Sequence, residues 1–171
     1  VLRNQNRLLF MYEGAEGIKT GWTTPAGRCF VGAASRDGWR LVSVVLNAPQ
    51  MWEDTQKLLD FGFTHYSWQE VITAGQPLVT AEIRKGREEK VALVAARSIG
   101  LPLKENEAEY LRYEFEVNEE ITAPVQKGQQ LGILHVYFGR QHVAQTPLVA
   151  AETVERGSLL HRLVTFFRNL F

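Results

Sequence analysis

The strongest constraint on the fold is a pair of apolar runs joined by an Asp-Gly turn. Residues 27–35 and 39–47 are both largely apolar, and Asp37 and Gly38 lie in the short link between them. An Asp-Gly pair tolerates the positive backbone angles of a tight turn. The sequence therefore predicts a β-hairpin, and the run at residues 17–23 predicts a third strand beside it.

The third strand contains the residues from which a function can be argued, namely Lys19, Thr20, Gly21, Trp22 and Thr23. We expect the Lys-Thr-Gly tripeptide to place an ammonium and a hydroxyl on one side of an accessible edge strand. Gly21 would let a ligand backbone lie close to this edge, while Thr20 and Thr23 would donate hydroxyl groups to a carboxylate. A tripeptide alone is a weak motif, because it also arises by chance. The pattern predicts a site for an anionic, peptide-like ligand.

The composition limits the other functions of the chain. Hydrophobic residues make up 45% of the sequence, and the net charge is zero with both signs interspersed. Such a chain can bury a core, and we expect no nucleic-acid partner. The single Cys29 rules out an internal disulfide and is expected to be a small buried hydrophobic residue. The four histidines lack the spacing of a structural zinc site, so we expect no metal and no cofactor.

Two segments with different periodicity follow the hairpin. Apolar residues at helical spacing predict a helix near residues 51–62 that covers the back of the sheet and ends at Gly62. From about Ser67, strand-like runs alternate with Gly, Pro and charged turns, which predicts an all-β sandwich of about eighty residues. Its strands are expected at residues 77–84, 90–96, 110–117, 130–138 and 142–150. The charge run from Arg84 to Lys90 is expected to be a solvated hairpin tip.

The last segment, residues 158–171, has an amphipathic pattern. At about 100° per residue its apolar side chains fall on one face, and Arg162 and Arg168 fall on the other. The apolar face consists of Leu159, Leu160, Leu163, Val164, Phe166, Phe167, Leu170 and Phe171. The pattern is typical of a helix that lies in a membrane interface, and it is too short to span. The alternative is a helix docked on this protein or on another chain.

The residues around Lys19 and the order of the segments resemble a known family. The run from Gly17 to Thr23 and the hairpin after it are similar to the region around the third motif of serine-type D-alanyl-D-alanine carboxypeptidases, the low-molecular-mass penicillin-binding proteins. The resemblance implies an α+β fold, with residues 1–66 as the C-terminal part of a transpeptidase domain of the penicillin-binding-protein and β-lactamase type. Residues 67–155 would be the all-β sandwich, and residues 156–171 an amphipathic membrane-anchoring helix.

The same resemblance implies an activity. Such enzymes remove the terminal D-Ala from peptidoglycan stem peptides through an acyl-enzyme, and they bind penicillin. In the family a Ser-x-x-Lys motif supplies the acylated serine and its base, and a Ser-x-Asn motif helps proton transfer; neither motif occurs in the 171 residues. We therefore expect this chain to supply the substrate-binding wall, to lack the nucleophile, which would lie before Val1, and to be inactive alone. Its catalytic layer should expose apolar surface where the preceding sequence packs.

The resemblance also implies the partners. The carboxylate of a D-Ala-D-Ala peptide would contact Lys19, Thr20 and Thr23, and a backbone N–H near Trp22 or Thr23 would donate to the oxyanion. β-Lactams would bind as mimics, and the N-terminal part of the same protein would complete the site. Some relatives have a carboxylate-binding arginine after the second hairpin strand; here that segment is Asn47 to Gln50, so this contact stays open. The anchor would hold the protein on the outer face of the bacterial cytoplasmic membrane.

Two alternatives remain. A β-lactamase-related hydrolase shares the Lys-Thr-Gly wall, but such an enzyme would end soon after the helix near 51–62, and about a hundred residues follow that helix here. The second alternative is a non-catalytic, membrane-associated β-domain protein that binds cell-wall peptide or a partner. In that case Lys19 would be an ordinary surface lysine.

Overall fold

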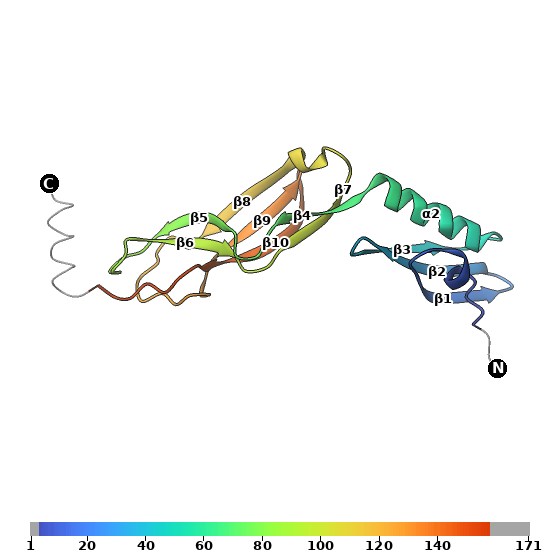
Figure 1. Cartoon of the computed structure of the whole chain (residues 1–171), viewed down its shortest axis with the longest axis horizontal. Helices are drawn as coiled ribbons and strands as arrows, with labels where there is room; N and C mark the ends of the chain where they lie inside the picture. Colours follow the sequence, from blue (N-terminus) through green and yellow to red (C-terminus); the bar gives the residue numbers. More distant parts are fainter. Residues whose placement is uncertain (1–3, 158–171) are drawn as a thin grey trace. The chain divides into compact units, whose positions relative to one another are not determined.

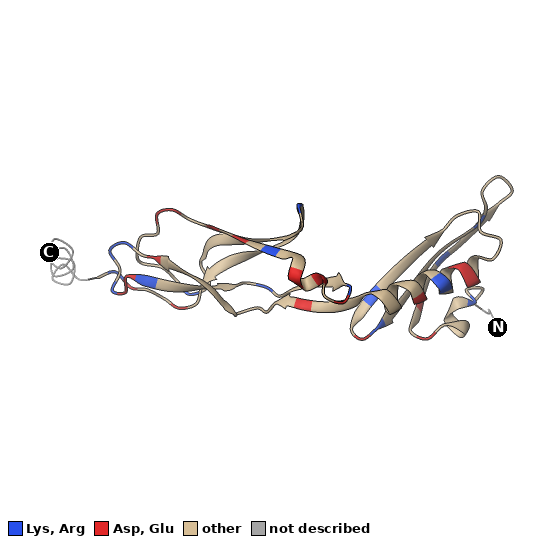
Figure 2. Cartoon of the chain, turned by 90° about the horizontal axis from the view of Figure 1, so that it is seen from above, with Lys and Arg blue, Asp and Glu red and all other residues tan. Residues whose placement is uncertain are grey.

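The structure, a computed structural model, describes residues 4–157 of the chain (Figure 1). It divides into two compact units, which are described one at a time. Unit 1 contains the residues up to Gln69 together with Pro102–Glu105, and unit 2 contains Glu70–Leu101 and the residues from Asn106 onward. Lys and Arg residues are interspersed with Asp and Glu residues on both units (Figure 2).

Unit 1 is built on a three-stranded antiparallel sheet with the order β1-β2-β3. Its elements are α1 (Leu8–Met11), β1 (Ala15–Thr23), β2 (Gly27–Arg36), β3 (Trp39–Val45) and α2 (Met51–His65). The predicted hairpin is confirmed, because Asp37 and Gly38 join β2 to β3 with φ values of 48° and 82°. The predicted third strand is also confirmed, and it lies at the edge of this sheet.

Helix α2 covers one face of the sheet, as the sequence predicts. Its buried residues include Trp52 and Leu59, and the Trp52 ring packs edge-on against Phe30 of β2 at a centroid distance of 4.7 Å. The prediction that Gly62 ends the helix is wrong, since α2 continues to His65. A Cβ added at Gly62 would lie 2.4 Å from Leu41 Cδ1, so this glycine allows the helix to approach β3 closely.

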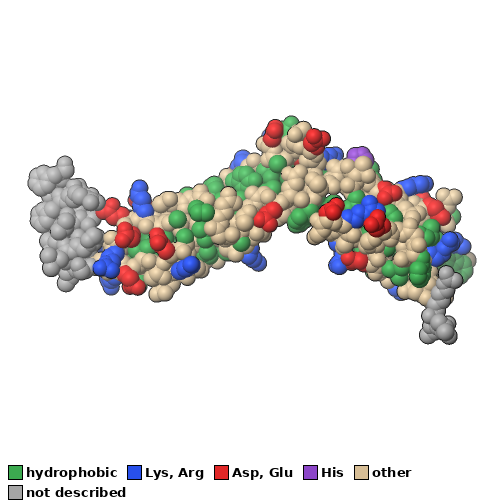
Figure 3. All heavy atoms as spheres, in the orientation of Figure 1, with side chains coloured by type: hydrophobic (Ala, Val, Ile, Leu, Met, Phe, Trp, Pro, Cys, Tyr) green, Lys and Arg blue, Asp and Glu red, His purple; other side chains and the backbone are tan. Residues whose placement is uncertain are grey.

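The other face of the sheet is apolar and open to solvent within the described residues. Val42, Val44 and Leu46 are 56%, 56% and 73% exposed. Alternation along a strand explains this, because Ser43 and Val45 of β3 are buried while Val42 and Val44 point the opposite way. Figure 3 shows one side of the molecule, on which hydrophobic side chains reach the surface of both units. The layer therefore exposes apolar side chains, as expected, and the packing of preceding sequence on them stays a prediction.

Unit 2 is dominated by strands. The elements after α2 are β4 (Ser67–Ile72), β5 (Pro77–Glu82), β6 (Lys90–Ala95), β7 (Ile99–Leu103), the 3-10 helix η1 (Glu107–Tyr110), β8 (Leu111–Val117), β9 (Gln130–Phe138) and β10 (Gln141–Ala150). Five of them form a sheet with the order β5-β6-β10-β9-β8, and β4 pairs with β7. The start of β4 and the end of β7 belong to unit 1. The five predicted strands are confirmed to within two residues at each end, whereas β4 and β7 were missed.

One core unites the strands of this β-rich domain. Leu93, Leu134 and Leu148 are fully buried in it, and Ile72 of β4 and Ile99 of β7 belong to the same cluster. The two sheets thus share apolar side chains, which agrees with the all-β expectation for this part of the chain.

The charge run between β5 and β6 is exposed to solvent, as the sequence predicts, but its backbone also pairs with other segments. Arg84 forms a β-bridge with Thr122, and Gly86 forms one with Arg156. The backbone N–H of Gly157 also donates to the carbonyl of Lys85 at 2.9 Å. The charge run is therefore held by two other segments of unit 2.

The predicted amphipathic helix at residues 158–171 lies outside the described residues. Within residues 4–157, no helix has the length and apolar character that crossing a membrane requires.

Candidate functional site

Strand β1 presents the Lys-Thr-Gly tripeptide at a sheet edge. Lys19, Thr20 and Gly21 pair with Val31, Phe30 and Cys29 of β2 on one side, and no described strand pairs with β1 on the other. Four of the five predicted site residues are exposed, and only Thr20 is partly buried. An edge strand offers unpaired N–H and C=O groups, so an extended peptide can add to it as a further strand.

The expectation that the ammonium and the hydroxyl lie on one side of the strand needs correction. Successive residues of a strand point to opposite faces. Thr20 lies opposite Phe30, whose ring is buried under α2, whereas Lys19 lies opposite Val31 on the other face. The Lys19 ammonium nevertheless donates to the backbone carbonyl of Thr20. Lys19 therefore lies on the open face of the sheet, and its charge is close to the strand backbone.

Gly21 is not required by the packing of the protein itself. A Cβ added at Gly21 would have one neighbour within 4 Å, the carbonyl oxygen of Cys29 at 4.0 Å. At Gly32 of the neighbouring strand, by contrast, an added Cβ would lie 2.7 Å from the Phe30 ring and 2.8 Å from Thr55. The glycine of the tripeptide leaves free space at the edge, which is the space that a ligand backbone would need.

The backbone directly before Lys19 is irregular. The register between β1 and β2 shifts between Ala15 and Gly17, and Gly17 and Ile18 have φ values of 96° and 142°. A positive φ is rare for a β-branched residue such as Ile18. Strained backbone of this kind clusters at ligand and active sites. The first part of β1 is therefore irregular, and the tripeptide lies in the regularly paired part that follows it.

The end of β1 is fixed by a compact turn. The backbone N–H of Ala26 donates to Thr23 Oγ1 at 3.2 Å, so this hydroxyl already has one partner. Arg28 lies opposite Trp22 in the sheet and donates to the carbonyl of Pro49 at 3.4 Å. This exposed guanidinium is a second cation at the same end of the sheet. No sequence pattern pointed to Arg28, because it precedes the apolar part of the β2 run.

Cys29 differs from its expected environment. Its side chain is half-buried rather than buried, and its thiol lies 3.5 Å from the carbonyl of Ala26. Cys29 pairs with Gly21, so it faces the open side of the sheet.

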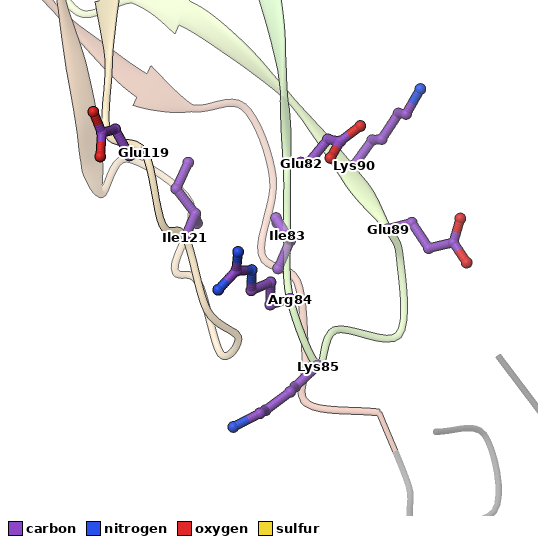
Figure 4. A pocket seen from close by; sticks show the side chains of 8 residues that line it. All are labelled: Glu82, Ile83, Arg84, Lys85, Glu89, Lys90, Glu119 and Ile121. Atoms are coloured by element: carbon purple, nitrogen blue, oxygen red, sulfur yellow. The ribbon is translucent and has the colours of Figure 1, made fainter. Parts of the chain in front are cut away.

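A separate hollow of about 460 Å³ lies in unit 2. Its lining combines Ile83 and Ile121 with charged side chains such as Arg84, Lys85 and Lys90. Figure 4 shows that these charged side chains point in different directions, and Arg84 forms an ion pair with Glu120 at 2.8 Å. The hollow therefore lacks the converging groups that an active site needs. Among residues 4–157, no group of three His, Cys, Asp or Glu side chains is arranged to hold a metal ion.

Comparison with protein families gives two adjacent matches. Residues 1–50 match the family described as D-alanyl-D-alanine carboxypeptidase, and residues 66–156 match the family described as penicillin-binding protein 5, C-terminal domain. The chain is 29% identical to the D-alanyl-D-alanine carboxypeptidase DacF of Bacillus subtilis, over 93% of this chain and 42% of that protein. It is 30% identical to DacC of Escherichia coli, over 98% of this chain and 43% of that protein.

Solved structures agree with these matches. Penicillin-binding protein 5 of Haemophilus influenzae superposes with a TM-score of 0.69 at 25% identity, over 90% of this chain and 46% of that one. The carboxypeptidase DacD of Francisella tularensis superposes with a TM-score of 0.61 at 32% identity, over 90% of this chain and 39% of that one. The chain spans less than half the length of these relatives. The second family match alone covers more than half of its residues, and the chain belongs to the penicillin-binding protein 5 type of D-alanyl-D-alanine carboxypeptidases.

Proposed function

We propose that this chain supplies the substrate-binding wall of a serine-type D-Ala-D-Ala carboxypeptidase. The substrate would be the D-Ala-D-Ala end of a peptidoglycan stem peptide, lying antiparallel or parallel to β1 as an added strand. Lys19 would attract the terminal carboxylate, and the Thr20 and Thr23 hydroxyls would donate to it. β-Lactams would occupy the same edge as mimics of the peptide.

The observation that supports this proposal best is the free edge at Gly21. A Cβ there would meet nothing closer than 4.0 Å, so the fold alone does not explain a glycine at this position. A peptide backbone in contact with the strand does explain it. The exposed Trp22, directly after the glycine, would shield the bound peptide from water.

The chemistry needs groups that this sequence does not contain. Acyl transfer requires an activated hydroxyl and donors for the oxyanion. A backbone N–H of Trp22 or Thr23 would provide one such donor. The acylated serine and its base would come from a Ser-x-x-Lys motif in the N-terminal part of the same protein, and this chain alone would form no acyl-enzyme. We propose that this N-terminal part packs on the apolar face formed by Val42, Val44 and Leu46.

The test is the acylation rate of the complete enzyme with a fluorescent penicillin. Lys19→Ala should lower this rate about 10²-fold, as expected for the loss of a charged contact that positions the ligand carboxylate. Lys57→Ala is the matched control, because Lys57 is an exposed lysine of α2 that pairs with Asp54 at 4.0 Å. Equal acylation of Lys19→Ala and Lys57→Ala would exclude Lys19 from the site and favour the non-catalytic alternative.

Product analysis separates the carboxypeptidase from a β-lactamase. A carboxypeptidase should release D-Ala from a stem peptide and hold penicillin as a long-lived adduct. Rapid turnover of penicillin without D-Ala release would favour the β-lactamase-related hydrolase. The match of residues 66–156 to the C-terminal domain of penicillin-binding protein 5 supports the carboxypeptidase.

We also propose that the amphipathic sequence at residues 158–171 attaches the enzyme to a membrane surface. Its apolar residues would enter the interface, and Arg162 and Arg168 would be attracted to anionic lipid. The protein would then act on the outer face of the bacterial cytoplasmic membrane, where peptidoglycan is accessible. This part of the proposal rests on the sequence pattern.

A further inference from the structure

A second hollow, of about 250 Å³, lies in unit 1 away from the Lys-Thr-Gly edge. It is formed where the β2–β3 turn meets the end of α2 and the start of β4. We call it the aromatic hollow, and its lining includes Trp39, Tyr66, Trp68, Arg36, Asp37 and Ser67. The residues of the turn and those after α2 are far apart in the sequence, so the sequence patterns did not reveal this site.

Indole rings form the walls of the aromatic hollow. The rings of Trp39 and Trp68 are nearly parallel, with an interplanar angle of 26° and a centroid distance of 6.4 Å. Phe63 supports Trp39 from the side, edge-on at 5.5 Å. Trp68 is nevertheless 48% exposed, so a large apolar face remains available to a ligand. An indole that is packed on one side and open on the other is a rigid platform for a flat apolar surface.

Polar groups of both signs lie beside this platform. The Arg36 guanidinium stacks between the rings of Tyr12 and Phe63, at 4.6 and 4.8 Å from their centroids, so its position is fixed. Its Nε is buried and has no hydrogen-bond partner in the protein. Asp37 is exposed in the turn, which has positive φ values of 48° at Asp37 and 82° at Gly38, and it lines the hollow.

The exposed indole face and the neighbouring charges of both signs together suit one class of ligand. Charges of both signs disfavour a strongly anionic or cationic ligand, and they suit a neutral molecule with many donors and acceptors. A pyranose ring has such hydroxyl groups at its rim and an apolar C–H face that stacks on an indole. An extended peptide has no flat face of that kind unless it contains an aromatic residue.

We propose that the aromatic hollow binds a sugar residue of the glycan strand of peptidoglycan. The proposal rests on the proposed function, since the stem peptide on β1 would be attached to that glycan. Val31, the partner of Lys19, lies five residues before Arg36 on β2, which corresponds to about 17 Å along the strand. Lys19 lies on the open face of the sheet and the aromatic hollow on the α2 face, so a peptide-substituted glycan strand would contact both by passing around the end of the sheet.

Binding can be measured on the intact chain with two probes, a tetramer of β-1,4-linked N-acetylglucosamine and glycan strands freed of peptide by an amidase. Two of the four tryptophans line the hollow, so saturable changes in tryptophan fluorescence and in indole N–H chemical shifts are expected. Trp68→Ala should weaken both probes at least tenfold. Asp37→Asn should also weaken them, and it should fold normally because Asn tolerates the same turn geometry.

Tyr110→Ala is the matched control, because Tyr110 is a 67% exposed aromatic residue of unit 2 that does not line the hollow. It should leave sugar binding unchanged. The proposal is overturned if neither probe saturates up to about 10 mM, or if Trp68→Ala and Asp37→Asn bind like the parent chain. It is also overturned if only the sugar-free stem peptide shifts the Trp68 signal. Sugar binding without D-Ala release by the complete enzyme would refute the proposed function but leave the hollow as a sugar site.

Discussion

The three-stranded sheet of unit 1 and the five-stranded sheet of unit 2 bury their apolar residues in different ways. Among the described residues, unit 2 has sixteen buried apolar residues in one cluster, whereas the cluster of unit 1 has six. In unit 1 that cluster lies under α2, and the opposite face exposes Val42, Val44 and Leu46. The difference indicates that unit 2 is stabilised by its own core, while one face of unit 1 is suited to a partner.

The edge strands show a related contrast. β8, at one edge of the unit 2 sheet, alternates Arg112, Glu114 and Glu116 along one face. Charged residues on an edge strand discourage the addition of another strand. β1 instead has Gly21 with free space beside it, preceded by a single lysine. The edge of unit 1 is therefore better suited to accept a peptide than the β8 edge.

The largest expected effect is on the unit 2 core. Leu134→Ala should lower the free energy of unfolding by about 2–5 kcal/mol, because Leu134 is fully buried and its truncation leaves a cavity. Val44→Ala should change it by no more than about 0.5 kcal/mol, since Val44 is exposed in this chain. Urea denaturation of the two variants measures both values. Equal losses would mean that the open face of unit 1 is already packed.

A pair of glycines on neighbouring strands gives the next effect. Gly32→Ala should cost about 1–3 kcal/mol of stability, because the new methyl would overlap Phe30, Thr55 and Leu8 under α2. Gly21→Ala should leave stability nearly unchanged, because its methyl has space. In the complete enzyme, however, Gly21→Ala should slow acylation by penicillin about 10²-fold by displacing the ligand.

Thermal unfolding and penicillin labelling of the same two variants separate these outcomes. The comparison fails if Gly21→Ala acylates at the parental rate, because the free space at the edge would then have no role. It also fails if Gly32→Ala is as stable as the parent.

Most strands and the Lys-Thr-Gly edge could be predicted from the sequence, because local signals agree with the fold there. The Asp37-Gly38 turn fixes the hairpin, and the apolar spacing after Pro49 fixes the face of α2. Gly62 misled the prediction of the helix end, since a local preference for termination was outweighed by close packing against Leu41.

Other features depend on contacts between distant residues. The aromatic hollow joins Trp39 to Trp68, and neither residue has a pattern that points to the other. The strand β4 was missed because it follows α2 after Tyr66 alone, with no Gly or Pro between them, and β7 was missed because Pro102 is atypical of a strand. The placement of Lys19 and Thr20 on opposite faces could have been deduced from strand alternation alone.

The amphipathic sequence at residues 158–171, which we propose as a membrane anchor, predicts an effect of intermediate size. Phe167→Glu should reduce binding to anionic vesicles about tenfold or more, because burying a Phe side chain contributes about 1.5–3 kcal/mol. Thr165→Glu is the matched control with the same added charge on the polar face. Flotation of the intact chain with vesicles measures both, and equal flotation of the two variants would contradict the proposed anchor.

The smallest expected effect concerns Glu16, at the irregular part of β1. Its carboxylate accepts a hydrogen bond from the Ser35 hydroxyl and pairs with Arg40, whose Nε lies 2.6 Å from Glu16 Oε2. The Ser35 hydrogen bond, and then the contact with Arg40, hold the pKa of Glu16 below its usual value despite some burial. These contacts link β1 to β2 and β3 at the end of the sheet away from Lys19.

A lowered pKa in the folded state means that the ionised carboxylate stabilises the fold. This stabilisation is complete above the usual glutamate pKa of about 4.3, and it is lost as the pH falls through the lower folded value. The melting temperature of the parent chain should therefore exceed that of Glu16→Gln slightly at pH 7, and the difference should shrink below about pH 4. Glu13→Gln, a change at an exposed glutamate in the preceding turn, is the control. A Glu16→Gln difference that stays constant from pH 7 to pH 3 would show that the carboxylate contacts do not stabilise this end of the sheet.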